Sequence, residues 1–280
     1  MISFASQSIK IMKDLLLLEW KKFNGNAVFK ALALIYIAIA PFVILAGKDV
    51  FKDMPPPMPS SKMFYEFPTV WDYQGYIGNW LVPFCLGFLA IYIVTSEVSN
   101  RTMRQNIIIG MTRKEFFYSK FLTILSFAVV ATVLYAISSI VIGVIHTDGF
   151  DLELIIDNNF AIVRYFLLCM GYMSFAMMLG FLIRKGTLTL LFYFLYVMML
   201  EPILMLIHVY YFKNSSRNYW PINSIEDLMP FPLFKLPDYF VNKEWNFNIL
   251  LPYTHAIGMA ILYSSIFIFV AYRSFMRRDI

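Results

Sequence analysis

Three side chains of the kinds that bind metals or move protons lie in or beside apolar segments: Glu201, His208 and His255. One carboxylate and two imidazoles form a ligand set that zinc hydrolases use. The spacing matches no metalloprotease motif, because no His-Glu-x-x-His occurs in the chain. We therefore predict no catalytic residue and no metal ligand, and we keep an intramembrane hydrolase built on these three residues as an alternative.

Glu201 is followed directly by Pro202 inside a long apolar segment. A charge in the bilayer is costly, so such an acid faces the bundle interior or water. Proline removes a backbone hydrogen bond and bends a helix. The pair indicates a helix break on a transport pathway or, equally, an acid that ties the bend to a neighbouring span. Arg164 is expected to extend to the lipid headgroups, with Glu201 as its alternative partner.

A short charged loop, residues 97–114, carries the remaining candidate residues. Asn100 is expected to cap a short helix over 101–109, and Gly110 to end it, because glycine readily adopts the left-handed conformation. Residues 112–115, Thr-Arg-Lys-Glu, match a capping box that starts another helix. These signals favour a docking element over a loop whose charges only fix topology. The candidate coupling residues are Glu97, Arg101, Thr102, Arg104, Gln105, Gly110, Thr112, Arg113 and Lys114.

The elements that must position these residues are membrane spans. The chain is 60% hydrophobic and only 15% charged, whereas soluble domains are about a quarter charged. Segments long enough to cross the bilayer need about 20 apolar residues. Six qualify: 28–46, 76–95, 115–145, 161–183, 188–210 and 250–272.

Orientation follows from the distribution of Lys and Arg. Most of the 23 basic residues lie near the two termini, in the loop 97–114 and between the fourth and fifth spans. The positive-inside rule therefore predicts that both termini and this loop are cytosolic. The basic pI of 9.0 reflects this bias, and we expect no nucleic-acid partner.

Two further segments are expected to contact the membrane lipid interface. Residues 1–27 place Leu15, Leu16 and Phe23 largely on one helical side, with lysines elsewhere, which predicts an interfacial amphipathic helix; a simple basic anchor is the alternative. The proline- and tryptophan-containing segment 211–249 predicts re-entrant or interfacial helices on the outer side. The expected fold is thus one all-α integral membrane domain over residues 1–280.

This layout resembles the membrane subunit of type-2 ABC transporters, the ABC-2 permease family. Members have six spans, cytosolic termini, a leading interfacial helix and a coupling helix in the first cytosolic loop. The family pattern in that loop and at the chain end is matched by Glu97, Arg101-Thr102, Gly110-Met111-Thr112-Arg113, Phe116-Phe117, Lys120 and the ending Tyr272-Arg273-Ser274-Phe275-Met276-Arg277-Arg278-Asp279-Ile280.

The resemblance implies a permease that couples ATP hydrolysis to substrate movement, most simply export across a bacterial cytoplasmic (inner) membrane. It implies a second permease chain, identical or related, and a separate nucleotide-binding subunit that holds ATP and Mg²⁺. The chain has no Gly-x-x-x-x-Gly-Lys-(Ser/Thr) loop, so we expect it to bind no cofactor and to be no enzyme itself. An additional extracytoplasmic subunit and a non-catalytic scaffold role are left open. The substrate is not indicated.

Overall fold

The described part of the chain is entirely helical. The computed structural model describes residues 2–50, 61–149, 152–232 and 250–278, and these contain no strand. Within them, five helical stretches are long and apolar enough to cross a membrane. The predicted all-α, multi-pass membrane fold is therefore confirmed, with five to six spans. The five stretches are Thr69–Ser99, Arg113–His146, Glu153–Ile183, Gly186–Phe212 and Tyr253–Arg277.

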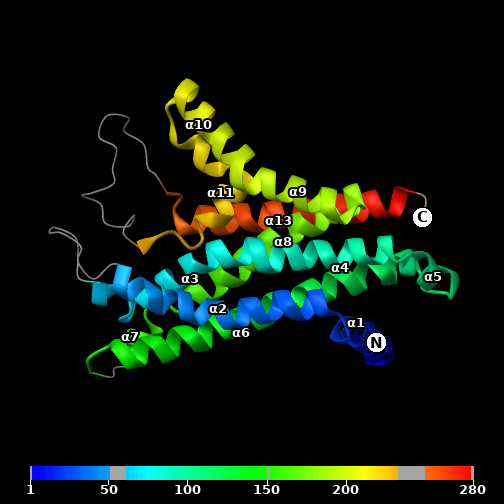
Figure 1. Cartoon of the computed structure of the whole chain (residues 1–280), viewed down its shortest axis with the longest axis horizontal. Helices are drawn as coiled ribbons and strands as arrows, with labels where there is room; N and C mark the ends of the chain where they lie inside the picture. Colours follow the sequence, from blue (N-terminus) through cyan, green and yellow to red (C-terminus); the bar gives the residue numbers. More distant parts are fainter. Residues whose placement is uncertain (1, 51–60, 150–151, 233–249, 279–280) are drawn as a thin grey trace.

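A sharp bend separates the first two helices, α1 (Ile2–Asn24) and α2 (Ala27–Val50). They qualify as a sixth span only as a pair, with 95° between Lys13–Asn24 and Ala27–Ile39. The Asn26 side chain accepts hydrogen bonds from two backbone N–H groups in the first turn of α2, at 3.0 and 3.2 Å. This is N-terminal capping, and it fixes α1 at a steep angle to α2 (Figure 1).

The second span is built from α3 (Thr69–Leu81), a π turn (Val82–Gly87) and α4 (Phe88–Ser99). Pro83 lies in the π turn, where its missing N–H disrupts the regular α-helical pattern. At the end of this turn, Gly87 lets the fifth span come close, because a Cβ on Gly87 would overlap the Tyr193 hydroxyl oxygen.

The short helix α5 (Thr102–Ile108) leads into α6 (Arg113–His146). With 34 residues, α6 is about 50 Å long at 1.5 Å per residue, more than the ~30 Å of hydrocarbon. After α7 (Leu152–Ile156), helix α8 (Ala161–Ile183) occupies the centre of the bundle, packed by α4, α6 and the last helix.

The fifth span also contains a π turn. It joins α9 (Gly186–Leu195) through Tyr196–Leu200 to α10 (Glu201–Phe212). The helix break predicted at Glu201–Pro202 is thus a wide turn directly before Glu201, after which the span continues. Short helices follow at Ser215–Tyr219 and α11 (Pro221–Glu226), and α13 (Tyr253–Arg277) ends the bundle. The predicted interfacial segment 211–249 is described only as far as residue 232.

The two ends of the bundle differ in content. In Figure 1, α1, α5 and the C-terminal end of α13 lie together at one end, and α7 lies at the other. Exposed basic side chains at the α5 end include Lys21, Arg101, Arg104 and Lys114. The elements that the sequence assigns to one side of the membrane are therefore neighbours in space.

Candidate functional site

A buried ion-pair cluster lies where α4 ends and α5 begins. The Glu97 carboxylate, with no exposed side-chain surface, accepts a hydrogen bond from the Lys120 ammonium at 2.5 Å. It also accepts hydrogen bonds from Lys22 and from the Thr102 hydroxyl at 2.5 Å. Buried charges are tolerated only when paired and hydrogen-bonded, and this carboxylate is held by partners from three helices.

Lys120 extends the cluster to a second acid. Its ammonium donates to Glu19 at 2.6 Å, and the Lys120 side chain is fully buried. The ammonium also lies over the rings of Phe116 and Phe23, 5.1 and 5.5 Å from their centroids, where cation–π attraction adds to the ion pairs. The cluster, defined as Glu19, Lys22, Glu97 and Lys120, thereby joins α1, α4 and α6.

Helix α5 projects from this anchored base. Its start differs from the prediction: Asn100 ends α4, and Arg101 in the left-handed conformation (φ 58°) precedes Thr102. The prediction that Asn100 caps the short helix is therefore wrong. Gly110 follows the helix with φ of 120°, a backbone conformation suited to glycine. The predicted helix–break–helix order is present.

The capping box predicted at the start of α6 is present. The Glu115 backbone N–H donates to the Thr112 hydroxyl at 3.2 Å, and the Thr112 N–H donates to the Glu115 carboxylate at 2.8 Å. Next to it, the Arg113 guanidinium donates to the backbone carbonyls of Met276 and Arg278. Arg113 thus ties the start of α6 to the end of α13, and Lys114 remains exposed.

The exposed surface of α5 is both basic and apolar. Arg101, Arg104 and Gln105 are exposed, whereas Met103 faces the protein and is buried. Ile108 and Ile109 are 83% and 85% exposed. Apolar side chains so exposed beside basic groups are typical of surfaces that contact another protein or a membrane.

Comparison of the sequence with known protein families identifies the family to which the chain belongs. Residues 15–219 match the sequence profile of a family described as ABC-2 family transporter protein. The chain belongs to the ABC-2 family. The match covers most of the ABC-2 permease, including the whole ion-pair cluster and α5, and it makes the chain a multi-pass membrane transport protein. Among curated proteins, none matches the chain in sequence.

The sequence pattern of the ABC-2 permease pointed to Glu97, Thr102 and Lys120 but missed Glu19 and Lys22. The signal for Glu19 was weak: an acid between Leu18 and Trp20 on an otherwise apolar face of α1. Lys22 was counted only as a topology-setting charge. Both side chains belong to α1: Glu19 is buried, and Lys22, although exposed, reaches the buried Glu97 carboxylate with its ammonium.

Glu201 is buried, with 1% exposure, and it holds the segment that follows the fifth span of the ABC-2 permease. Its carboxylate accepts a hydrogen bond from the backbone N–H of Asn223 at 2.8 Å, in the first turn of α11. An acid near the N-terminus of a helix satisfies free N–H groups and complements the helix dipole. The acid therefore links the bend at Pro202 to α11.

The two histidines have separate partners. His208 contacts Ser216 through Nε2 at 2.7 Å and accepts a hydrogen bond from Trp220 at 3.4 Å. His255 contacts the Tyr219 hydroxyl through Nδ1 at 2.7 Å. In the described ranges, no group of three or more His, Cys, Asp and Glu side chains is arranged to hold a metal. The geometry therefore gives no support to the hydrolase alternative.

Arg164 does not reach the headgroups. It is 1% exposed and donates to Asp72 at 3.0 Å and to Asn158 at 2.7 Å. Its guanidinium also lies 3.8 Å from the centroid of the Tyr253 ring. The expectation of a snorkelling arginine is wrong, because a buried acid on α3 was available to pair with it. This second ion pair joins α3, α8 and α13 at the end opposite α5.

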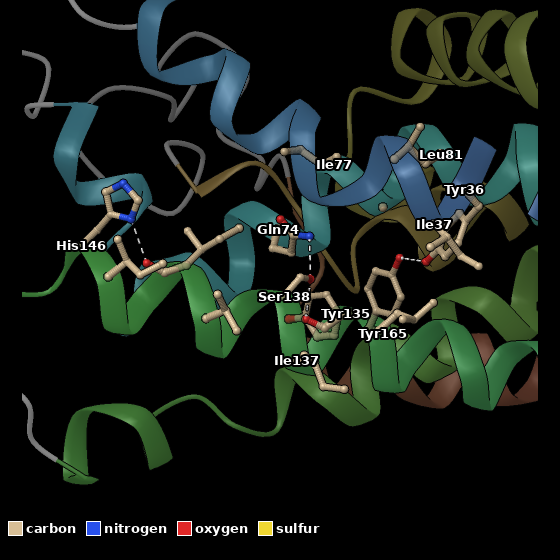
Figure 2. Close-up of a pocket in the computed structure, with 15 residues that line it drawn as sticks. Tyr36, Ile37, Gln74, Ile77, Leu81, Tyr135, Ile137, Ser138, His146 and Tyr165 are labelled. Carbon is tan, nitrogen blue, oxygen red and sulfur yellow. Dashed lines mark hydrogen bonds between the residues drawn. The ribbon is translucent and has the colours of Figure 1, made fainter. Parts of the chain in front are cut away.

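A cavity of about 430 Å³ lies between α2, α3, α6 and α8. Figure 2 shows the hydroxyl groups of Tyr36 and Tyr165 pointing toward each other, 2.5 Å apart, and Gln74 reaching Ser138 at 3.0 Å. Among the described residues, its lining contains no Asp, Glu, Lys or Arg. This described lining suits an apolar or weakly polar molecule.

Proposed function

We propose that this ABC-2 permease is the membrane subunit of an ATP-driven exporter in a bacterial cytoplasmic membrane. Both termini and α5 are cytosolic. A separate nucleotide-binding subunit binds ATP and Mg²⁺ and docks on α5, while this chain catalyses no reaction. Family membership supports the transport role, and the basic residues gathered around α5 support the orientation.

The observation that carries this proposal is that the exposed surface of α5, called the tip, lies next to the buried ion-pair cluster. Arg101, Arg104, Ile108 and Ile109 present a mixed basic and apolar surface. Arginine is enriched among the hot spots of protein interfaces, and exposed apolar side chains mark contact surfaces. Directly behind them, Thr102 at the start of α5 donates to Glu97, which is paired with the buried Lys120 of α6.

The same arrangement supplies a route for movement. A subunit that shifts α5 also displaces Glu97, which is joined to Lys22 on α1 and to Lys120 on α6. Because broken buried ion pairs cost several kcal/mol, these helices follow α5 instead of separating from it. Closure of the ATPase is thereby transmitted to at least the first three spans.

A second permease chain completes the transporter, as a homodimer or a related heterodimer. The fifth span, Gly186–Phe212, supports this because only 17% of the residues in its apolar stretch are buried inside the chain, against 67% for the second span. Its exposed apolar face is available to another copy as well as to lipid.

The test is affinity purification of the tagged chain from its native membrane in mild detergent. We expect a soluble ATPase with a Gly-x-x-x-x-Gly-Lys-(Ser/Thr) loop to co-purify with the parent chain. Arg101→Glu with Arg104→Glu reverses the charge of the tip and should remove this partner. Lys213→Glu also reverses a charge, at an exposed position just after the C-terminal end of the fifth span. This control variant should still bind the ATPase.

Membrane insertion of each variant is measured in parallel by its yield in the membrane fraction. Docking through α5 is refuted if the double variant inserts normally and retains the ATPase. The transporter assignment itself is refuted if the parent chain, crosslinked and obtained in good yield, brings down no ATPase.

A further inference from the structure

A second cavity lies under the interfacial helix. It has a volume of about 490 Å³, is open on one side and is lined by α1, the start of α2 and the first half of α6. Its walls are mainly the aromatic and aliphatic side chains of Leu16, Phe23, Phe29 and Phe127. Because the ABC-2 permease alone forms this cavity, a ligand can bind there without an ATPase.

Among the lining residues that the structure describes, the polar groups leave one free charge, at the rim. The hydroxyls of Thr123 and Ser126 donate to carbonyls of their own helix, each at 2.8 Å, and the Glu19 carboxylate is paired with Lys120. Lys13 lines the cavity and is exposed. The interior is therefore apolar, while its opening carries a cation.

The residues of α1 at the opening indicate that it lies at the level of the lipid headgroups. Lys13, Leu16, Leu17 and Trp20 all line the cavity and recur at the i, i+3, i+4, i+7 spacing of one helical face. Trp20 is 58% exposed, and tryptophan concentrates where acyl chains meet headgroups. A helix with this face, set steeply against α2, lies along the interface with the cavity extending into the adjacent leaflet.

The size and apolar lining of the cavity indicate an acyl chain. Apolar cavities of about 150 Å³ stay free of water and take up benzene, and this one is about three times as large. Basic pockets beside spans on the cytoplasmic side bind anionic headgroups. We propose that the cavity binds one anionic phospholipid of the leaflet beside α1, with an acyl chain inside and its phosphate at Lys13.

A lipid bound in this cavity would stabilise the adjoining ion-pair cluster. Phe23 lines the cavity and also contacts the Lys120 ammonium, and Glu19 belongs to both sites. A chain that fills the cavity packs α1 against α6, where these side chains meet. Lipid composition would then affect how firmly α1 is held, independently of any soluble partner.

The experiment measures lipid retention by native mass spectrometry of the purified full chain. Phosphatidylglycerol and phosphatidylcholine with identical acyl chains are added in parallel. We expect the parent to retain phosphatidylglycerol preferentially and Lys13→Gln to weaken that retention about fivefold, the effect of one basic residue near a headgroup. Lys21→Gln removes the same charge from an exposed position outside the cavity and should change nothing.

A cavity-filling variant, Ser126→Phe, tests the acyl-chain part and should lower retention of both lipids; a thermal melt verifies its folding. The proposal is overturned by equal retention of the two lipids by the parent, or by equal effects of Lys13→Gln and Lys21→Gln, which would indicate diffuse attraction. A folded Ser126→Phe protein with parental retention overturns it as well. If that variant does not fold, the two lysine variants decide.

Discussion

Replacing Lys120 with methionine removes the central cation of the cluster while keeping an unbranched side chain of similar length. The change leaves Glu19 and Glu97 buried close together, with Lys22 as the remaining cation. Removing one partner of a buried ion pair costs about 3–5 kcal/mol. At roughly 2–4 °C per kcal/mol for a chain of this order of size, the melting temperature should fall by about 6–20 °C.

The assay is thermal unfolding of the purified chain in detergent, with trypsin cleavage at Lys21 and Lys22 as a report on α1. Both readouts should change together, because the broken pair frees α1 from α6. Lys114→Met, an exposed lysine of the same helix, is the matched control and should melt like the parent.

A compensated variant separates the pair from simple packing. Lys120→Met combined with Glu19→Gln and Glu97→Gln removes the unpaired buried acids, and replacing a whole buried network is often nearly neutral. It should therefore regain most of the lost stability. If Lys120→Met alone melts within about 2 °C of the parent, a shift worth about 1 kcal/mol or less, the cluster does not hold α1 and this reasoning fails.

Three further predictions concern the opposite end. Arg164→Leu leaves Asp72 buried without its guanidinium and should destabilise the chain by about 3–5 kcal/mol, measured by the same melt; a parental melting temperature would show that the pair is dispensable. Glu201→Gln retains an acceptor for α11 and should keep stability within about 1 kcal/mol, so loss of transport in vesicles without loss of stability would assign its charge to the pathway. Burial raises the pKa of Glu226 and Asp227 to about 7 each. Above about pH 4.5 the folded state then binds more protons than the unfolded chain, so stability should fall as the pH rises towards 7. The melting temperatures at about pH 5 and pH 8 should therefore differ less in the variant Glu226→Gln with Asp227→Asn than in the parent. An unchanged difference would contradict this.

Features governed by neighbouring residues were predictable from the sequence. Hydropathy identified the spans because each must cover the bilayer by itself. The capping box at Thr112 and Glu115 and the glycine stop at Gly110 need only a few consecutive residues. Asn100 was misassigned because a residue between two helices can end one or begin the next, and the left-handed turn at Arg101 carries no reliable sequence signal.

Features governed by distant residues were not predictable. Glu19 and Lys120 are separated by 101 positions and Arg164 and Asp72 by 92. Nothing local distinguishes a buried charge from one that extends to the headgroups, because the same side chain can do either. One partner of Glu201 is likewise a distant backbone N–H group, that of Asn223, which no side-chain pattern reveals.

The π turn of the fifth span has a geometric effect on Glu201. The buried residues Thr189, Tyr193, Val197 and Glu201 recur every four positions, and in a plain α-helix twelve residues would leave the last about 120° out of line with the first. The one extra residue of the π turn takes back about 100° of this drift. The turn therefore acts as a phase correction. It rotates α10 back about the helix axis, so that an acid which would otherwise turn away from the bundle stays in line with Tyr193 and faces α11.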